Sequence, residues 1–361
     1  MEKLLSIIVP SYNMEKYLSK CLGSLIVEDS ELLQTLDVIV VNDGSKDGTS
    51  EIAHKFEKKY PGVIRVIDKQ NGHYGSCVNA GLKIAKGTYV KILDADDTFD
   101  TVRFSTFLGF LGKCTEPMVD LVLSDVEIVD EGGNVVSRVS YGGDGQTIVA
   151  HEFCDLLKND GFVGKYHMHG VAYQTDMLRR LGYCQSEGIA YTDNEWTILP
   201  MRGVSRYAVF PQVVYRYLVG REGQSVSAAV IKRNAWMIRK SFLHILNECV
   251  KRRSELDWWH KEYDERWLRW RSVNVYESSL LSDLSTESHI ELRKIDDCLK
   301  IAYPGVWKSL ADCFVLFGRL TIRFRYLAVW RRMRRFGGVV LIFVLSYNWI
   351  REKLTPRKIC D

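Results

Sequence analysis

The sequence predicts an α/β protein with a doubly wound, mostly parallel sheet and a C-terminal helical extension. Two observations lead to this fold class. Through the first half, short apolar runs alternate with amphipathic segments of helical period. From about Ala228 the pattern turns helical, with aromatic and charged residues on alternate faces. The 361 residues are 46% hydrophobic, which is ordinary globular composition in a chain long enough for roughly two domains.

The strands and helices of the first half follow one another in alternation. Apolar runs typical of buried strands cover residues 4–9, 37–41, 63–67 and 89–93. Amphipathic runs typical of helices cover residues 14–26, 49–60 and 75–85. Because connections between parallel strands are right-handed, this order predicts a parallel sheet with helices on both faces.

The pattern is less regular after this alternating part. It predicts a strand over 120–130, a Gly-rich turn at 131–134, a helix over 153–159, a helix start near Thr192, strands and a loop over 207–227, and a helical, basic end after Pro304. The domains that we expect are residues 1–227, with halves of about 1–125 and 126–227, a helical region over 228–318, and a basic amphipathic tail over 319–361.

Composition argues against several classes of protein. The net charge of +4 is too small to indicate nucleic-acid binding. Nine cysteines occur without CxxC pairs, which argues against a zinc site and a disulfide framework. We expect reduced thiols in a cytosolic protein, with Cys21, Cys77 and Cys184 as small core residues. No segment of the signal-peptide type opens the sequence.

Polar segments follow each predicted strand of the alternating part. They are PSYN at 10–13, NDGSKDGT at 42–49, DKQNGHYG at 68–75 and DADD at 94–97. Parallel strands bring such segments to one edge of the sheet, where open α/β sheets bind ligands. The Gly and Lys spacing fits neither a GxGxxG fingerprint nor a P-loop, so a dehydrogenase or an NTPase is unsupported. For 42–49 alone, an ordinary turn at Gly44 is the alternative.

The DADD segment concentrates the carboxylates of Asp94, Asp96 and Asp97. Two unit charges ~4 Å apart repel each other by roughly 4 kcal/mol at an effective dielectric constant of ~20. A Mg²⁺ or Mn²⁺ ion with oxygen ligands would offset this repulsion. The alternative is a solvated turn in which Asp97 or Thr98 caps a helix.

Together, the motifs resemble the family 2 glycosyltransferases, which have the GT-A fold. The resemblance spans roughly residues 4–227 and rests on the segments SIIVPSYNMEKYLSKCLGSL, DVIVVNDGSKDGT, NGHYGSCVNAGLKIAKGTYVKILDADD, AYTDNEW and YRYLVGREGQSVS, in the order of the family. The sequence departs from the common pattern at His73 and Tyr74, where many members carry another Gly.

The resemblance implies roles for the residues of the cleft. Asp43 would contact the nucleobase, usually uracil, Asp94 would lie near the ribose, and Asp96 would coordinate a Mn²⁺ or Mg²⁺ ion that bridges the diphosphate. The implied donor-binding residues are Pro10, Ser11, Tyr12, Asn13, Asp43, Gly44, Asn71, Gly72, Asn79, Asp94, Arg221, Gln224 and Ser225.

The family's catalytic base is an acidic residue at the start of a helix. The resemblance assigns this role to Asp193, with Glu195 as the second choice. A carboxylate can take the proton of an acceptor hydroxyl while that oxygen attacks the anomeric carbon. The alternative is that Asp193 only caps the helix, helped by Glu195 in the first turn.

Two further segments are expected to border the site. Arg216 and Arg221 belong to a polar loop that, by resemblance, closes over the donor diphosphate, and the alternative is an ordinary surface loop. His167 and His169 would point to one side of a strand. Because no further ligand cluster is evident, contact with the acceptor or simple packing is preferred to a metal role.

The end of the sequence is basic and aromatic. Seven arginines between Arg319 and Arg335 are interleaved with apolar residues, and the apolar run that follows is shorter than the ~20 residues of a spanning helix. This pattern is typical of a helix at a membrane surface. The alternatives are a helix packed on the protein and, more weakly, nucleic-acid binding.

The function that follows is a metal-dependent, inverting glycosyltransferase. The expected donor is a UDP-sugar, and the acceptor is a glycan or a polyprenyl-linked oligosaccharide of a bacterial surface polysaccharide. We expect a cytoplasmic protein, peripheral at the inner face of the membrane, without a nucleic-acid partner. The alternatives are a polyprenyl-phosphate glycosyltransferase, which usually lacks the TDNEW and GQS segments, and a sugar-nucleotide-binding scaffold without turnover.

Overall fold

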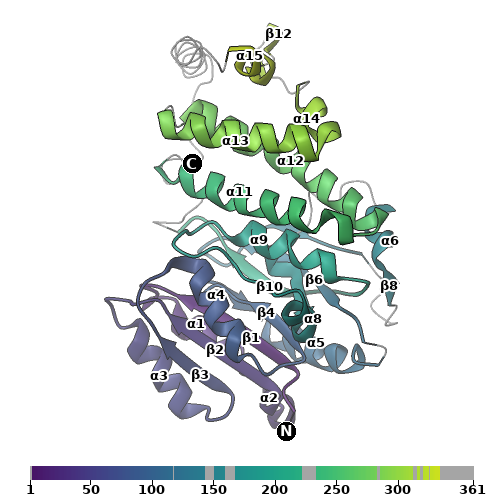
Figure 1. Cartoon of the computed structure of the whole chain (residues 1–361). Helices are drawn as coiled ribbons and strands as arrows, with labels where there is room; N and C mark the ends of the chain where they lie inside the picture. The colour runs from purple at the N-terminus through teal and green to yellow at the C-terminus, as the bar shows by residue number, and fades with distance from the viewer. Residues whose placement is uncertain are drawn as a thin grey trace. The chain divides into compact units, whose positions relative to one another are not determined.

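The structure is a computed structural model, shown in Figure 1. It describes residues 2–116, 118–142, 150–158, 167–221, 233–282, 285–311, 315–317, 320–324 and 326–333. The chain divides into two compact units, Met1–Gln224 and Ser225–Asp361. The first unit is a mixed α/β structure, and helices make up most of the described part of the second.

The first unit contains the predicted sheet. Its strands are β1 (Leu5–Ser11), β2 (Leu36–Asn42), β3 (Ile64–Asp68), β4 (Tyr89–Ile92), β5 (Thr98–Phe99), β6 (Leu121–Val129), β7 (Val135–Val139), β8 (His151–Glu152), β9 (Val171–Gln174) and β10 (Arg206–Leu218). Its helices are α1 (Leu18–Gly23), α2 (Ser30–Gln34), α3 (Thr49–Lys59), α4 (His73–Ile84), α5 (Thr101–Lys113), α6 (Phe153–Lys158), α8 (Thr175–Arg180) and α9 (Asp193–Ile198), with short 3-10 turns η1 (Met168–Gly170) and η2 (Pro200–Gly203).

The ten described strands of the first unit form one sheet in the order β3-β2-β1-β4-β9-β6-β10-β5, with β7 beside β6 and β8 beside β10. The pairs β3-β2, β2-β1, β1-β4 and β6-β10 are parallel, whereas β9 is antiparallel to both of its neighbours. The predicted fold class, a mostly parallel doubly wound sheet, is therefore confirmed.

Both faces of the sheet are covered by helices, and β1 shows why. Leu5, Ile7 and Val9 join the hydrophobic core that α1 and α5 build on one face. Ile8 points to the opposite face, where a Cβ added at Gly81 of α4 would lie 2.7 Å from its Cγ2. A continuous apolar run is thus needed, because both sides of this strand are buried.

Several elements differ from the sequence-based expectation. Helix α1 (Leu18–Gly23) is shorter than the helix predicted over 14–26. Helix α5 was not predicted. The Asp100 side chain caps α5 by accepting a hydrogen bond from Arg103 N. Cys184 is exposed in the loop after α8 rather than part of the core, whereas Cys21 and Cys77 are buried. In β10, the register against β6 shifts between Phe210 and Val213, a stretch that contains Pro211, and again between Val213 and Tyr215. Proline cannot donate to a strand ladder, which accounts for the first shift.

The second unit consists mainly of helices. They are α11 (Ala235–Arg252), η3 (Arg253–Glu255), α12 (Trp258–Ser282), α13 (Thr286–Ala302), α14 (Pro304–Leu310) and α15 (Tyr326–Met333). After α14 the helical prediction is wrong in part, because β11 (Val315–Phe317) and β12 (Leu320–Phe324) pair as antiparallel strands. Among the described residues, no helix combines the length and the apolar character needed to cross a membrane.

One buried carboxylate links four helices of the second unit. Asp296 of α13 is fully buried. Its Oδ1 accepts hydrogen bonds from Tyr276 Oη of α12 at 2.8 Å, Trp307 Nε1 of α14 at 3.0 Å and Arg331 Nε of α15 at 2.8 Å. Leu327 and Trp330 of α15 are also buried. This part of the predicted tail is therefore packed in the second unit.

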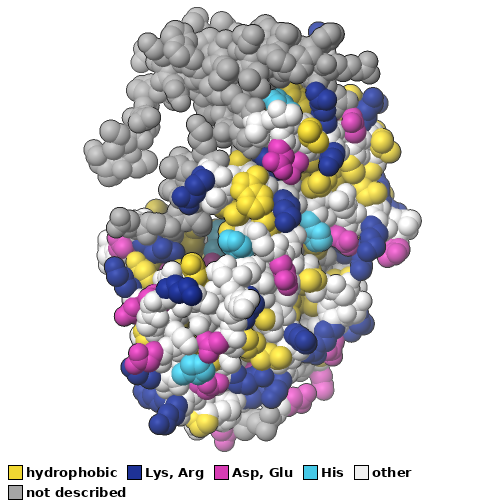
Figure 2. All heavy atoms as spheres, turned by 60° about the vertical axis from the view of Figure 1, so that its left-hand side comes forward, with side chains coloured by type: hydrophobic (Ala, Val, Ile, Leu, Met, Phe, Trp, Pro, Cys, Tyr) yellow, Lys and Arg dark blue, Asp and Glu magenta, His cyan; other side chains and the backbone are white. Residues whose placement is uncertain are grey.

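On the face shown in Figure 2, the basic and acidic side chains of the described residues are interspersed. This distribution is in line with the small net charge of +4.

Candidate functional site

The segments after the parallel strands meet at one edge of the sheet, and hydrogen bonds link neighbouring segments. Asn13, after β1, accepts a hydrogen bond from Lys46 N on its Oδ1 at 2.8 Å, and its own N–H donates to Ser45 Oγ at 3.0 Å. Asn13 has a positive φ of 55°, a conformation that asparagine tolerates better than most residues. The first and second segments are thereby joined as predicted.

Asp43, after β2, is buried and joins the second segment to the third. Its Oδ1 accepts hydrogen bonds from Lys69 Nζ at 2.6 Å and from Gly72 N at 3.0 Å, and its carbonyl accepts one from Asn71 Nδ2 at 3.0 Å. Gly44 follows with a φ of 74°, and a Cβ there would lie 3.2 Å from Asn71 N. The glycine is required for this close approach.

Asp97 is the most deeply buried carboxylate of the DADD segment. Its Oδ2 accepts a hydrogen bond from Tyr215 Oη at 2.6 Å and its Oδ1 one from Leu218 N at 2.7 Å. Burial, then the charges of Asp94 and Asp96, raise its pKa well above the usual value for Asp. Asp97 binds β10 and caps no helix, so the suggested capping role is wrong.

Asp94 connects the DADD segment to α4 and to η1. Its Oδ1 accepts a hydrogen bond from Tyr74 Oη at 2.7 Å, and its Oδ2 lies 3.4 Å from His169 Nε2. Burial works to raise the pKa of Asp94, but the hydrogen bonds of His169 and Tyr74 and the charges of His169 and Arg221 outweigh it, so the pKa is lowered.

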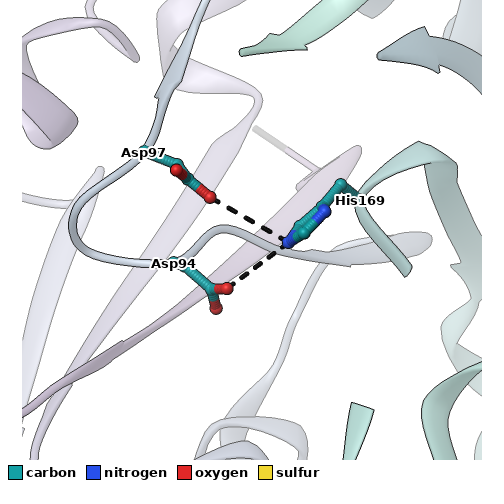
Figure 3. Close-up of side chains that lie close together, drawn as sticks. All are labelled: Asp94, Asp97 and His169. Atoms are coloured by element: carbon teal, nitrogen blue, oxygen red, sulfur yellow. Dashed lines mark hydrogen bonds and ion pairs between the residues drawn. The ribbon is translucent and has the colours of Figure 1, made fainter. Parts of the chain in front are cut away.

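Asp94, Asp97 and His169 form a group that could hold a metal ion. One ligand atom from each lies within 4.8 Å of the others, and Figure 3 shows both carboxylates directed toward the same imidazole. Carboxylate oxygen and imidazole nitrogen are ligands that Mn²⁺ accepts, so the donor set fits such a cation.

The two histidines lie at the start of β9 rather than on a strand. His167 is in a loop and His169 in the 3-10 turn η1, because β9 begins only at Val171. Their rings are nonetheless side by side, with the two Nδ1 atoms 2.6 Å apart. Burial and the charge of His169 lower the pKa of His167 to about 3.

Asp96, the predicted metal ligand, lies outside this group of three. Its Oδ2 accepts a hydrogen bond from Arg221 Nε at 2.5 Å. The guanidinium of Arg221 lies 5.5 Å from the centre of the Tyr17 ring. Burial and the charge of Asp94 raise the pKa of Asp96. Arg221 thus reaches the predicted diphosphate end of the cleft, while Gln224 and Ser225 lie outside the described residues.

Asp193, the predicted base, is the first residue of α9 and is partly exposed. Its Oδ1 accepts a hydrogen bond from Asn194 Nδ2 at 3.1 Å. After burial and Asp94, the charge of Asp193 contributes to raising the pKa of Tyr74, so Asp193 lies on the side of the cleft where Tyr74 meets Asp94. Glu195, the second choice, is fully buried and accepts a hydrogen bond from Ser186 N at 2.7 Å.

Asn79 holds a loop rather than facing the DADD segment. Its side chain donates to Gln185 O and Glu187 Oε1, both at 2.9 Å, and accepts from Gln185 N at 2.8 Å. Asn79 also lines a cavity of about 440 Å³ with residues of α8, and none of the cleft carboxylates line it. Its place in the predicted donor-binding set therefore stays a prediction.

The remaining predicted residues lie on or after β1 and β10. Pro10 and Ser11 are buried in β1, whereas the Tyr12 side chain is 46% exposed. Arg216 Nε lies 3.5 Å from Glu127 Oε2, and the Arg216 backbone pairs with Thr98, the residue after Asp97. The partners Tyr74 and Tyr215 were not predicted from the sequence. Only for Tyr74 did the sequence offer a hint, because the chain departs there from the common family pattern.

The chain is similar to one protein family and to several known proteins. Residues 6–141 match the family model described as glycosyl transferase family 2. The chain is 38% identical over 231 residues, 64% of its length, to the minor teichoic acid biosynthesis protein GgaB of Bacillus subtilis. It is 26% identical over 227 residues, 63% of its length, to the poly(ribitol-phosphate) beta-N-acetylglucosaminyltransferase TarS of Staphylococcus aureus.

A solved structure has the same fold. The crystal structure of residues 1–349 of S. aureus TarS in complex with UDP-GlcNAc covers 97% of this chain and 91% of its own, with a TM-score of 0.63 and 19% identity. The sequence alignments span 25% of the length of GgaB and 37% of the length of TarS.

Proposed function

The chain belongs to glycosyl transferase family 2 through its residues 6–141, and from this premise we propose that it transfers a sugar from a nucleotide-sugar donor to a hydroxyl group with inversion. The observation that supports the proposal most is the single edge at which Asp43 and the DADD carboxylates are gathered, with Asp193 near enough to Tyr74 for its charge to act on that tyrosine. Such an edge can bind a nucleotide with its diphosphate, and it offers a carboxylate that can accept a proton.

The donor that we propose is a UDP-sugar. TarS, which has the same fold, has been crystallised with UDP-GlcNAc and with UDP. In this chain the Asp43 carboxylate would accept a hydrogen bond from the base, while Asn13 shapes the segment that runs along the nucleotide. Asp94 would contact the ribose.

A divalent cation is part of the proposal. Asp94, Asp97 and His169 would hold it as the structure stands, with Asp96 as the ligand that sequence resemblance suggests. When bound, such an ion supplies positive charge that stabilises the departing diphosphate. Arg221, which is paired with Asp96 here, would add charge on the same side.

The transfer itself is assigned to Asp193. The acceptor oxygen forms a bond to the anomeric carbon as the bond from that carbon to the diphosphate oxygen breaks. The bonding electron pair leaves with the nucleoside diphosphate, and the proton of the acceptor hydroxyl passes to the Asp193 carboxylate. A single displacement inverts the anomeric configuration.

We propose an acceptor from a bacterial surface polysaccharide, such as a glycan or a polyprenyl-linked oligosaccharide. The names of GgaB and TarS, which refer to teichoic acid and poly(ribitol-phosphate), support this class. We further propose that the enzyme acts on the cytoplasmic side, at the membrane surface.

The donor can be tested by thermal shift. The intact protein is screened against nucleotide sugars and free nucleotides, with Mn²⁺ and with a chelator. UDP and at least one UDP-sugar should raise the melting temperature, and the shift should shrink with the chelator. A shift produced only by guanine or adenine nucleotides would overturn the UDP assignment.

The base can be tested with Asp193→Asn. Transfer should fall by roughly 10²–10⁴-fold, the usual contribution of a general base, while the donor-induced thermal shift stays the same. Asp176→Asn, which changes an exposed carboxylate of α8, is the control and should leave transfer unchanged. Full transfer by Asp193→Asn would show that this residue is not the base, and donor binding without transfer by the intact protein would favour a scaffold.

A further inference from the structure

A lysine lies buried behind the acidic edge. Lys91 is on β4, three residues before Asp94, and its side chain is 0% exposed. Within the part of the chain that the structure describes, no carboxylate forms an ion pair with it. Burial alone lowers its pKa to about 7. A charged group without a counterion is costly inside a protein.

The ammonium of Lys91 bonds to two backbone carbonyls across the sheet. Its Nζ donates to His169 O at 2.5 Å and to Val171 O at 3.2 Å. Strands β4 and β9 pair only at Tyr89 with Gln174 and at Val90 with Tyr173. Beyond these pairs, the Lys91 side chain links β4 to the start of β9.

This link ends at the residues of the cleft. His169 carries the bonded carbonyl, and its own Nε2 lies 3.4 Å from Asp94 Oδ2 and 3.9 Å from Asp97 Oδ2. The Lys91 Nζ also lies 5.8 Å from the centre of the Tyr215 ring, and Tyr215 is the residue that donates to Asp97. Lys91 therefore supports the histidine and the tyrosine that contact the two carboxylates.

We propose that Lys91 is a positioning residue that fixes the His169 backbone so that the imidazole stands against Asp94 and Asp97. An apolar side chain would fill the same space without a desolvation cost, but it would leave the His169 carbonyl without this donor. The consequence for cation binding rests on the proposed function, whereas the position of the ring does not.

The test compares Lys91→Met with Tyr89→Phe in the full chain. Met keeps the length of the stem and removes the donor. Tyr89 is on the same strand, equally buried, and its hydroxyl bonds to Cys114 O, so its loss controls for general damage to β4. The first readout is the ¹H–¹⁵N NMR signal of the His169 ring, assigned with His169→Gln. The second is binding of Mn²⁺ alone, followed by electron paramagnetic resonance.

In Lys91→Met, the His169 signal should shift and Mn²⁺ should bind roughly tenfold more weakly, the usual cost of losing a group that orients a metal ligand. Tyr89→Phe should change neither. A His169 signal that is the same in Lys91→Met and in the unmodified protein overturns the proposal. A shifted ring with unchanged Mn²⁺ binding supports the positioning role and counts against the cation site of the proposed function.

If Lys91→Met does not fold, Lys91→Gln keeps an N–H donor on a side chain that is one bond shorter. The His169 signal should then lie nearer to that of the unmodified protein than to that of a histidine exposed to solvent. A His169 ring with the signal of a solvent-exposed histidine in a folded Lys91→Gln protein would contradict the proposal.

Discussion

At the scale of single residues, the DADD carboxylates are each held by a different partner. Tyr74 bonds to Asp94, Arg221 to Asp96, and Tyr215 to Asp97. Two hydroxyl donors and one guanidinium thus reduce a repulsion that would be roughly 4 kcal/mol per close pair. The sequence predicted the crowding of charge correctly, but these partners come from two other segments of the chain, α4 and the end of β10 with the loop after it.

A pH dependence is expected from His54. Its ring lies 2.7 Å from Asp68 and 2.8 Å from Glu57, and these hydrogen bonds raise its pKa above 6.5. The stabilisation is therefore fully present below the unfolded-state pKa of about 6.5 and is lost as pH rises through the higher folded-state pKa. It should stay below about 1 kcal/mol, because the side chains are about half exposed.

The measurement is urea unfolding of His54→Gln and of the unmodified protein at pH 6 and pH 9. The stability difference between them should be larger at pH 6. Lys55→Gln, which breaks an exposed pair with Glu51, should show nearly the same difference at both pH values. A His54→Gln difference that grows toward pH 9 would contradict the assignment.

At the scale of elements, α4 positions two sides of the cleft. It begins at His73, so Tyr74 in its first turn reaches Asp94, while Asn79 further along holds the loop after Cys184. The helix and this loop touch at Gly75, where an added Cβ would lie 2.1 Å from Ser186 O. A glycine inside this helix therefore has a packing reason.

Gly75→Ala should destabilise the protein by about 1–3 kcal/mol, the usual cost of overpacking, although Ala is the better helix former. Gly109→Ala in α5 is the matched control, since an added Cβ there meets no atom within 4 Å. That change should stabilise by up to about 1 kcal/mol. Urea unfolding measures both, and equal stability changes would rule out the contact with Ser186.

The regular part of the fold was predictable because its signal is local. The apolar runs that became β1 to β4 and the amphipathic runs that became α3 and α4 lie within a few residues of the predictions. Helix α5 was not predicted, and His169 was expected on a strand. The roles of His169 and Tyr215 depend on contacts between residues far apart in the chain, which no pattern of neighbouring residues encodes.

At the scale of the whole molecule, the second unit includes part of the predicted tail. Leu327 and Trp330 are buried, and Arg331 bonds to the buried Asp296. Burial of each apolar side chain is worth about 1.5–3 kcal/mol, and removing Arg331 would weaken the neutralisation of Asp296. The packing of α15 and the proposed membrane binding of residues 334–361 can therefore be tested separately.

A chain ending at Gly318 should unfold several kcal/mol more easily than a chain ending at Met333, which keeps these contacts. Thermal unfolding of both chains and of the full protein checks this. If the Gly318 chain and the Met333 chain have the same melting temperature, α15 does not stabilise the second unit.

The Met333 chain is also the suitable variant for vesicle flotation, because it keeps α15. Reduced binding relative to the full protein would support a membrane role for residues 334–361.

The antiparallel direction of β9 has a consequence for how the protein folds. Because β9 runs against β4, its beginning lies beside the end of β4, and this brings His169 to an aspartate 75 residues earlier in the chain. Such a site exists only once β4 and β9 have paired, and long-range pairings of this kind form slowly. A ligand that binds there selects the fully folded chain, and at one hundred times its Kd it would add about 2.7 kcal/mol to the free energy of unfolding.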